Sequence, residues 1–152
     1  MKFMLNGALT LGTMDGANVE ISQQVGNDNI YIFGQTSDQV IHRYEMGDYQ
    51  ASQWVEGDPN IRRAIDFLTG PEMLAAGNAE NLQRLHDDIM GKDWFMALLD
   101  IEEYIQTKER VRADYEDQDA WMRQALINIA NAGTFSSDRT ISQYNDEIWH
   151  LS

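Results

Sequence analysis

The apolar positions at the start of the chain predict a short helix followed by a short strand. Residues 3–5 form an apolar run that Gly7 can end as a helix. Residues 9–13 are largely apolar, as in a buried strand, and the pair at 15–16, Asp-Gly, is typical of a turn. The order helix, strand and turn is therefore expected within the first sixteen residues.

The next two apolar segments complete a repeating pattern of strands and helices. Asn18 is expected to cap a helix that runs to Val25 and stops at Gly26, and residues 30–33 form a second buried strand. Two strands joined through a helix predict parallel pairing with a right-handed crossover. Two strands alone do not make a stable sheet, so this unit is expected to belong to a larger one.

The remainder of the chain carries helical spacing. A capping box at 36–39 and an Asp-Pro pair at 58–59 mark two helix starts, and the Ser-Asp pair at 137–138 marks a third. The Trp and Tyr residues fall on helical periods, so we expect them in the core. The helices predicted after the second strand span residues 36–45, 58–68, 81–90, 100–115, 121–129 and 137–148.

Composition and charge restrict the possible partners. The 152 residues are 43% hydrophobic, which is enough for one domain with a core. Twenty-five acidic against eleven basic residues give a net charge of -14, which excludes nucleic acid and anionic membranes as primary partners. The chain has no cysteine, so disulfides and thiolate metal sites are impossible. No apolar run is long enough to cross a bilayer.

Titratable side chains do not form a recognisable catalytic or metal-binding pattern. The carboxylate clusters have no histidine at ligand spacing, so a solvated acidic face is the better interpretation. The three histidines are scattered and are expected at the surface or at helix ends. We predict no catalytic residue and no metal site among these groups, which are Asp87-Asp88, Glu102-Glu103, residues 117–119, His42, His86 and His150.

One lysine lies in the apolar run at the start of the chain. Lys2 precedes Phe3, and a lysine held against apolar surface loses ammonium solvation, which frees its amine for imine chemistry. Its surroundings resemble the pyridoxal-phosphate lysine segment of the α-glucan phosphorylases (glycogen, starch and maltodextrin phosphorylase). The resemblance rests on Met1-Lys2-Phe3-Met4-Leu5-Asn6-Gly7-Ala8 and on Gly12-Thr13-Met14-Asp15-Gly16-Ala17-Asn18-Val19-Glu20. It implies that Lys2 forms the Schiff base with the cofactor.

The end of the chain resembles the same family. The matching segments are Asn128-Ile129-Ala130, residues 133–141, Tyr144 and Ile148-Trp149, whereas residues 49–98 match only weakly and Lys108 departs from the family. The resemblance implies an α/β, predominantly helical fold: the closing half of a Rossmann-like domain in a two-domain, GT-B type glycosyltransferase, with C-terminal helices. Residues 1–98 are then a partial Rossmann-like segment and residues 99–152 a C-terminal helical segment.

The resemblance also implies an activity, that of a C-terminal part of a glycogen or maltodextrin phosphorylase. Such an enzyme transfers the terminal α-1,4 glucosyl unit of a glucan to inorganic phosphate, giving glucose 1-phosphate, and is expected to be a cytoplasmic homo-oligomer. In the family a Glu-Ala-Ser-Gly-x-Gly-Asn run before the lysine cradles the cofactor phosphate. This sequence starts after that run, so we expect the chain alone to be an inactive fragment without bound cofactor. The alternative is a non-catalytic, acidic helical interaction module.

Overall fold

The computed structural model describes residues 1–151 and divides them into two compact units. Unit 1 contains residues 1–33 and the chain from residue 106 onward, and unit 2 contains residues 34–105. Helix α8 (Ala97–Asp114) begins in unit 2 and ends in unit 1. Helices dominate both units, and the two strands of the described chain are two residues long each, so the predicted helical character of the fold is confirmed.

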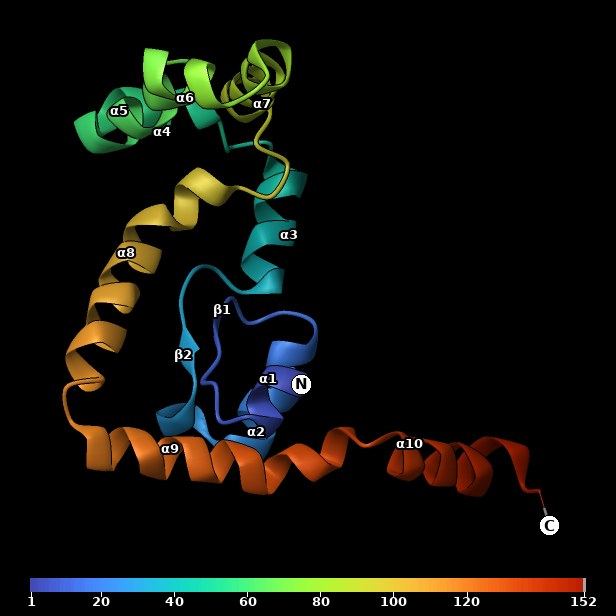
Figure 1. Cartoon of the computed structure of the whole chain (residues 1–152). Coiled ribbons are helices and arrows are strands. Elements are labelled where there is room, and N and C mark those ends of the chain that lie inside the picture. The colour runs from blue at the N-terminus through green and yellow to red at the C-terminus, as the bar shows by residue number, and fades with distance from the viewer. Residues whose placement is uncertain (152) are drawn as a thin grey trace. The chain divides into compact units, whose positions relative to one another are not determined.

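Unit 1 contains both strands and the C-terminal helices (Figure 1). Strand β1 (Leu11–Gly12) pairs in parallel with β2 (Tyr31–Ile32), and Tyr31 donates its N–H to the Thr10 carbonyl at 2.9 Å. The predicted parallel β-α-β order is confirmed, but the strands are shorter than expected, because ladder pairing covers only their central residues. The other elements are α1 (Lys2–Leu5), α2 (Ala17–Val25), η1 (Asn27–Asn29), α9 (Gln118–Asn131), η2 (Ala132–Phe135), α10 (Ser137–Tyr144) and η3 (Asn145–Trp149).

Two predicted helix caps in unit 1 are wrong by one or two positions. Helix α2 begins after Gly16, whose φ is +46°, and Asn18 instead donates its side-chain amide to the Thr13 carbonyl at 2.9 Å. Helix α10 is capped by Ser136, whose Oγ accepts from the Arg139 N–H at 3.3 Å, rather than by Ser137. At α10 two adjacent serines are suitable caps and Ser136 takes the position, whereas α2 begins at a glycine without a side-chain cap because Asn18 bonds to Thr13 instead.

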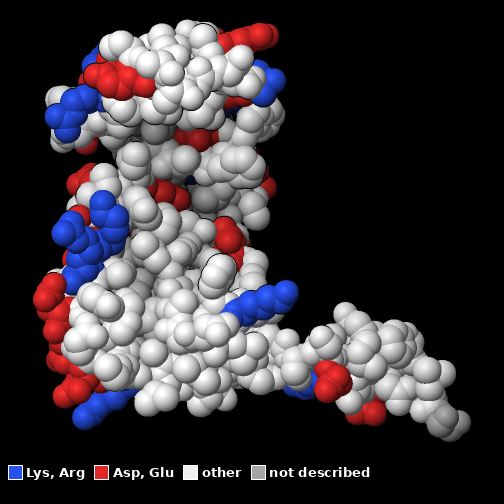
Figure 2. Space-filling view, in the orientation of Figure 1, with Lys and Arg blue, Asp and Glu red and all other residues white. Residues whose placement is uncertain are grey.

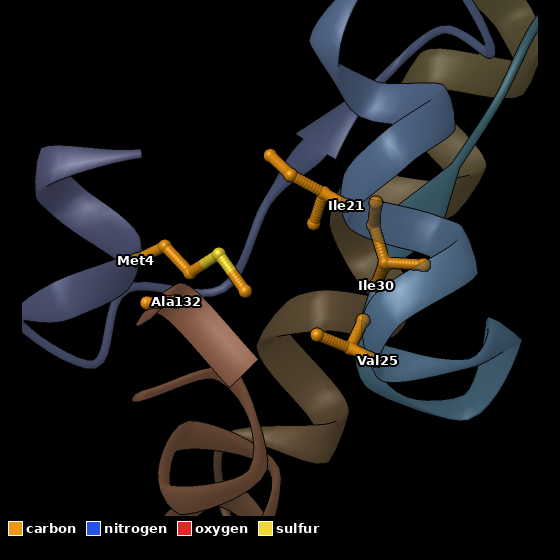
Figure 3. Packing of buried hydrophobic residues seen from close by; sticks show 5 residues of the cluster. All are labelled: Met4, Ile21, Val25, Ile30 and Ala132. Atoms are coloured by element: carbon orange, nitrogen blue, oxygen red, sulfur yellow. The ribbon is translucent and has the colours of Figure 1, made fainter. Parts of the chain in front are cut away.

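The core of unit 1 joins segments from both ends of the chain. Figure 3 shows Met4, Ile21, Val25, Ile30 and Ala132 gathered from α1, α2, the residue before β2, and η2. Met4 is 1% exposed and is the most deeply buried member of this cluster. Each such side chain contributes about 1.5–3 kcal/mol on burial. Contacts across the whole length of the chain therefore hold the N-terminal helix in place.

Unit 2 is a group of short helices. It contains α3 (Ser37–Met46), α4 (Ala51–Gly57), α5 (Pro59–Leu68), α6 (Pro71–Ala76) and α7 (Ala79–Gly91). The predicted capping box at Thr36 and Gln39 is confirmed, and so is the Asp58 cap, whose Oδ1 accepts from the Asn60 N–H at 2.7 Å. Helices α4 and α6 were not predicted, because one or two turns carry too few apolar residues to show a helical period.

The core of unit 2 is separate from that of unit 1. Its buried members are Ala51, Val55, Ile61, Ile65 and Leu98. The expectation that aromatic residues lie in the core is confirmed for Tyr31 in unit 1 but wrong for Trp54 and Trp94, which are 37% and 58% exposed. None of the helices within residues 1–151 combines the length and hydropathy needed to span a membrane.

Candidate cofactor site at Lys2

Helix α1 fixes the backbone of Lys2. The helix is four residues long and ends at Asn6, whose side-chain amide donates to the Lys2 carbonyl at 2.7 Å. Gly7 follows with a φ of +81°, a conformation that favours glycine. Met4 anchors α1 in the unit 1 core. The residues around Lys2 thus fix the backbone position from which the Lys2 side chain extends.

The side chain of Lys2 is exposed, so the expectation that apolar surface covers it is wrong. Phe3 and Leu5 are also exposed, at 82% and 56%. The physical reason is that a four-residue helix has one side against the core, and consecutive apolar residues point in different directions around it. Only Met4 takes the buried position. The apolar run therefore predicted the helix correctly but not its buried face.

Lys2 differs from the other two lysines of the sequence. Lys92 lies over the Trp94 ring with its Nζ 3.7 Å from the centroid, and Lys108 Nζ lies 3.6 Å from Glu109 Oε1. Within the described chain, the Lys2 ammonium has no ion pair or hydrogen bond. A primary amine that is exposed and unpaired is accessible for condensation with an aldehyde.

The second motif segment forms an ordered turn between β1 and α2. Asn18 reaches back to the Thr13 carbonyl, and the Thr13 hydroxyl donates to Asp15 Oδ2 at 2.9 Å. A Cβ added at Gly12 would lie 2.6 Å from Asn18 Nδ2, so only glycine fits beneath that amide. These side chains stabilise the turn through contacts with one another, and the turn leads directly into α2.

Among the described residues, a partner can be named for the aldehyde of pyridoxal phosphate but not for its phosphate. The Lys2 amine suits the aldehyde of the cofactor, as argued above. A phosphate needs several converging backbone N–H groups or cations, and the four-residue α1, which has no side-chain cap at Met1, does not provide an extended helix start. Among the described residues, Lys2 thus offers an amine suited to the cofactor aldehyde, and we assign no residue to the cofactor phosphate.

The histidines considered in the sequence analysis are either exposed or make a local contact. His86 lies 3.0 Å from Asp87 Oδ1, and His42 and His150 are exposed. The structure does not bring these side chains together with Lys2 into one site.

Sequence reasoning did not single out Asn128 as an interior polar residue. It is fully buried, and its amide donates to the carbonyls of Asn29 at 2.9 Å and Gln124 at 3.0 Å, while its Oδ1 has no partner within the described residues. These bonds tie α9 to the segment before β2. The only sequence signal was its place in the Asn128-Ile129-Ala130 motif.

Comparison with known proteins identifies the family to which these segments belong. The carbohydrate phosphorylase family matches residues 1–151, and the chain belongs to this family. The predicted relation to α-glucan phosphorylases is therefore confirmed.

Individual relatives match along almost the entire chain. It is 56% identical over 152 residues to maltodextrin phosphorylase of Streptococcus pneumoniae, covering all of this chain and 20% of that protein. It is 41% identical to glycogen phosphorylase of Bacillus subtilis and 43% identical to the muscle form of glycogen phosphorylase of Bos taurus, covering 99% and 98% of this chain. The matches cover 19% and 18% of those two proteins. The chain thus spans about a fifth of the length of these relatives.

Proposed function

We propose that this chain is part of an enzyme that transfers the terminal α-1,4 glucosyl unit of a glucan to inorganic phosphate, giving glucose 1-phosphate. The observation that carries the proposal is the 56% identity to a maltodextrin phosphorylase over all 152 residues. The similarity includes the segment around Lys2 and the segments near residue 130, which lie in the same compact unit. No catalytic residue is assigned within the chain itself.

Lys2 is proposed to hold pyridoxal phosphate through its amine. When bound, this cofactor supplies a phosphate group that exchanges a proton with the substrate phosphate. The contribution of the chain is positional: Met4 anchors α1, and Asn6 and Gly7 end the helix, so the Lys2 backbone is fixed while its amine remains exposed. The attachment keeps the cofactor oriented and does not itself move the glucosyl unit.

The finer fold assignment is part of this proposal. The parallel β1-α2-β2 unit is what the closing half of a Rossmann-like domain in a GT-B type enzyme would contain. Each strand has one neighbour within the described residues, so it has a free edge at which further strands could pair. The division into residues 1–98 and 99–152, the homo-oligomer and the cytoplasmic location stay predictions for the complete enzyme.

A chimeric enzyme tests the proposed function. The matching segment of the Streptococcus pneumoniae maltodextrin phosphorylase is replaced by this chain, and phosphorolysis of maltoheptaose is measured. We expect glucose 1-phosphate to form, and borohydride reduction followed by peptide mapping to find the cofactor on Lys2. A folded chimera that binds the cofactor but releases no glucose 1-phosphate would contradict the proposed function.

Substitutions in the chimera separate the role of Lys2 from a general effect of lysine removal. Lys2→Ala should abolish both the covalent attachment and the activity. The matched control is Lys92→Ala, which removes another lysine, one that contacts Trp94 in unit 2, and should retain both. Cofactor label that stays at full level in Lys2→Ala would show that the attachment point lies elsewhere.

The chain expressed by itself should release no glucose 1-phosphate. Stabilising the transition state requires groups that bind the glucosyl unit and the substrate phosphate, and we assign none in this segment. The matched control is Lys2→Ala of the same chain. Product formation above that control would show that this fifth of the enzyme suffices for the chemistry.

A further inference from the structure

A hollow of about 480 Å³ lies within unit 2, whereas Lys2 belongs to unit 1. Its walls come from α3, α4, α5 and the first turns of α8. The volume falls within the range of about 300–1,000 Å³ that small-molecule sites occupy. Ile61 and Leu98 give it a buried apolar floor, since both belong to the unit 2 core. The hollow is thus large enough for a ligand and rests on the best-packed part of the unit.

Trp54 provides an aromatic face in this hollow. The ring is 37% exposed, and its centroid lies 6.5 Å from that of Tyr49, tilted by 31°. Tyr49 is in turn fixed, because its hydroxyl donates to Asp93 Oδ2 at 2.6 Å and Asp93 is 6% exposed. A buried carboxylate therefore holds Tyr49, and Tyr49 contacts the indole from one side. An aromatic ring that is partly exposed is suited to stack against a flat ligand surface.

The polar groups around the indole include both donors and acceptors. Arg43 uses Nε to contact Gln35 Oε1 at 2.8 Å and Nη1 to contact Asp48 Oδ2 at 3.4 Å, which leaves its other N–H groups for a ligand. Gln53 adds an amide. The acceptors lining the hollow are the carboxylates of Asp48, Asp58 and Glu102.

The charged and hydrogen-bonding side chains that line the hollow restrict the chemical class of ligand that it can bind. Three carboxylates against one guanidinium disfavour a phosphate or another anion. The same net negative charge attracts a cation, but a cation would use only the acceptors and would leave the donors of Arg43 and Gln53 without a ligand partner. Within the described residues no group of carboxylates and histidines is arranged to hold a metal ion. A neutral ligand rich in hydroxyl groups can use donors, acceptors and the aromatic face together.

We propose that this hollow is a secondary saccharide-binding site that stacks a sugar ring of an α-1,4 glucan on Trp54. Arg43 and Gln53 donate to the sugar hydroxyls, and the carboxylates accept from them. The choice of an α-1,4 glucan over another neutral saccharide rests on the proposed function. The residues that line the hollow all belong to unit 2 and do not include Lys2, so the two proposed sites share no residue and can be tested separately.

Titration of the purified chain with maltoheptaose tests this site directly. The sequence has four tryptophans, and in the ¹⁵N-labelled protein each gives one indole N–H signal. We expect the Trp54 signal to move with saturating dependence on maltoheptaose, while that of Trp94 stays in place. Inorganic phosphate and spermidine, as the anionic and cationic alternatives, should leave Trp54 unchanged. A folded chain whose Trp54 signal ignores maltoheptaose, or responds only to spermidine or phosphate, would overturn the proposal.

Substitutions separate stacking from other effects. Trp54→Ala should weaken maltoheptaose binding by about threefold to tenfold, the range that an aromatic contact supports. Trp94→Ala is the matched control, because it removes an exposed indole outside the hollow, and its affinity should equal that of the unchanged chain. Should Trp54→Ala unfold, Trp54→Phe and Gln53→Ala replace it, with intermediate and weakened binding expected. Equal affinity in all variants would contradict the assignment.

The test distinguishes this site from the proposed function. In the chimeric enzyme, phosphorolysis of maltoheptaose is measured without any substitution in the hollow, so it reports the proposed function, whereas the Trp54 signal of the purified chain reports the secondary site. Absence of phosphorolysis in the chimera, together with retained glucan binding by the purified chain, would count against the proposed function alone. Retained phosphorolysis without a Trp54 response would count against the secondary site alone.

Discussion

At the scale of single residues, the carboxyl group of Asp100 is held in a position unfavourable to its charge. It lies half-buried on α8 and accepts a hydrogen bond from the Gln35 N–H at 3.1 Å. Burial raises the pKa of Asp100, the Gln35 hydrogen bond lowers it, and the nearby charges of Glu103 and Asp93 raise it further. The net direction is upward, so folding favours the protonated acid.

Replacement of Asp100 by Asn should therefore stabilise the chain at neutral pH. The folded pKa of Asp100 is higher than the unfolded pKa of about 3.9. Between these two values the folded protein binds more protons than the unfolded protein, so the free energy of unfolding falls as pH rises. Asn removes the charge but keeps an acceptor for Gln35. We expect a higher Tm than the unchanged chain at pH 7 and a difference that vanishes below about pH 3.9.

An aspartate of opposite character provides the control. Hydrogen bonds from His86 and Gln83 lower the pKa of the exposed Asp87 carboxyl. Its ionised form contributes stability above the unfolded pKa, which is lost as pH falls through the folded value. Asp87→Asn should thus lower the Tm slightly at pH 7, and the same direction of change in both variants would contradict the interpretation of Asp100.

Tyr31 offers a second pH-dependent test, at the alkaline end. Its phenol is buried and donates to Asp114 Oδ2 at 3.0 Å, and burial, followed by the Asp114 contact, raises its pKa to about 12. Between pH 10, the ordinary value, and about 12, unfolded tyrosine ionises while folded Tyr31 stays neutral, so stability falls as pH rises. The Tyr31→Phe variant has no phenol at this position, so its stability does not fall for this reason over that pH range.

Chemical unfolding at two pH values measures the effect. At pH 8, Tyr31→Phe should be less stable by about 1 kcal/mol, because the hydrogen bond to Asp114 is gone. Above pH 10 the difference should shrink as the unchanged protein loses stability. Tyr144→Phe, at an exposed ring, is the control and should follow the unchanged chain. A difference that stays constant with pH would contradict the assignment of the shift to Tyr31.

At the scale of elements, the connection from β2 to α3 depends on one glycine. Gly34 has a φ of +79°, and an added Cβ would lie 2.6 Å from Asp100 Oδ2. Its N–H donates to Glu103 Oε2 at 3.0 Å. Two carboxylates of α8 therefore hold the backbone at residues 34–35, and there is no space for a side chain at Gly34.

Gly26 provides a matched comparison for this contact. It has a nearly identical φ of +78°, but no atom lies within 4 Å of an added Cβ. Alanine at either position is strained by the positive φ, at a cost of about 1–3 kcal/mol. We expect Gly34→Ala to lower the free energy of unfolding by more than Gly26→Ala, since only the former also displaces Asp100. Measured losses that are equal would show that the carboxylate moves aside freely.

The same elements show what sequence patterns can and cannot predict. The capping box at Thr36 and the Asp58 cap were predicted because each depends on residues within one helical turn. The Asn128 amide bonds to the Asn29 carbonyl across 99 positions, and no local pattern contains that pairing. The hollow at Trp54 likewise needs four helices. Lys2 was found through its motif, whereas its exposure depends on how α1 packs.

At the scale of the whole molecule, several large apolar side chains of the described residues are exposed. Phe3 and Phe95 are 82% and 89% exposed. On the face shown in Figure 2, the surface over α9 is largely uncharged, and Met122 and Leu126 on this helix are 57% and 63% exposed. Exposed apolar side chains on an uncharged surface favour contact with other protein.

We therefore expect the isolated chain to associate with itself, in a manner that salt controls. The net charge of -14 makes copies repel at low ionic strength, whereas about 1 M salt shortens the screening length to about 3 Å and leaves the apolar attraction. Sedimentation velocity should show larger species as salt and protein concentration rise. Replacing Met122 and Leu126 by Glu should reduce this association, whereas the same change at exposed Gln118 and Arg123 should add charge without removing apolar contact. A monomer at all salt concentrations, or equal reduction in both double variants, would show that the exposed apolar side chains do not drive association.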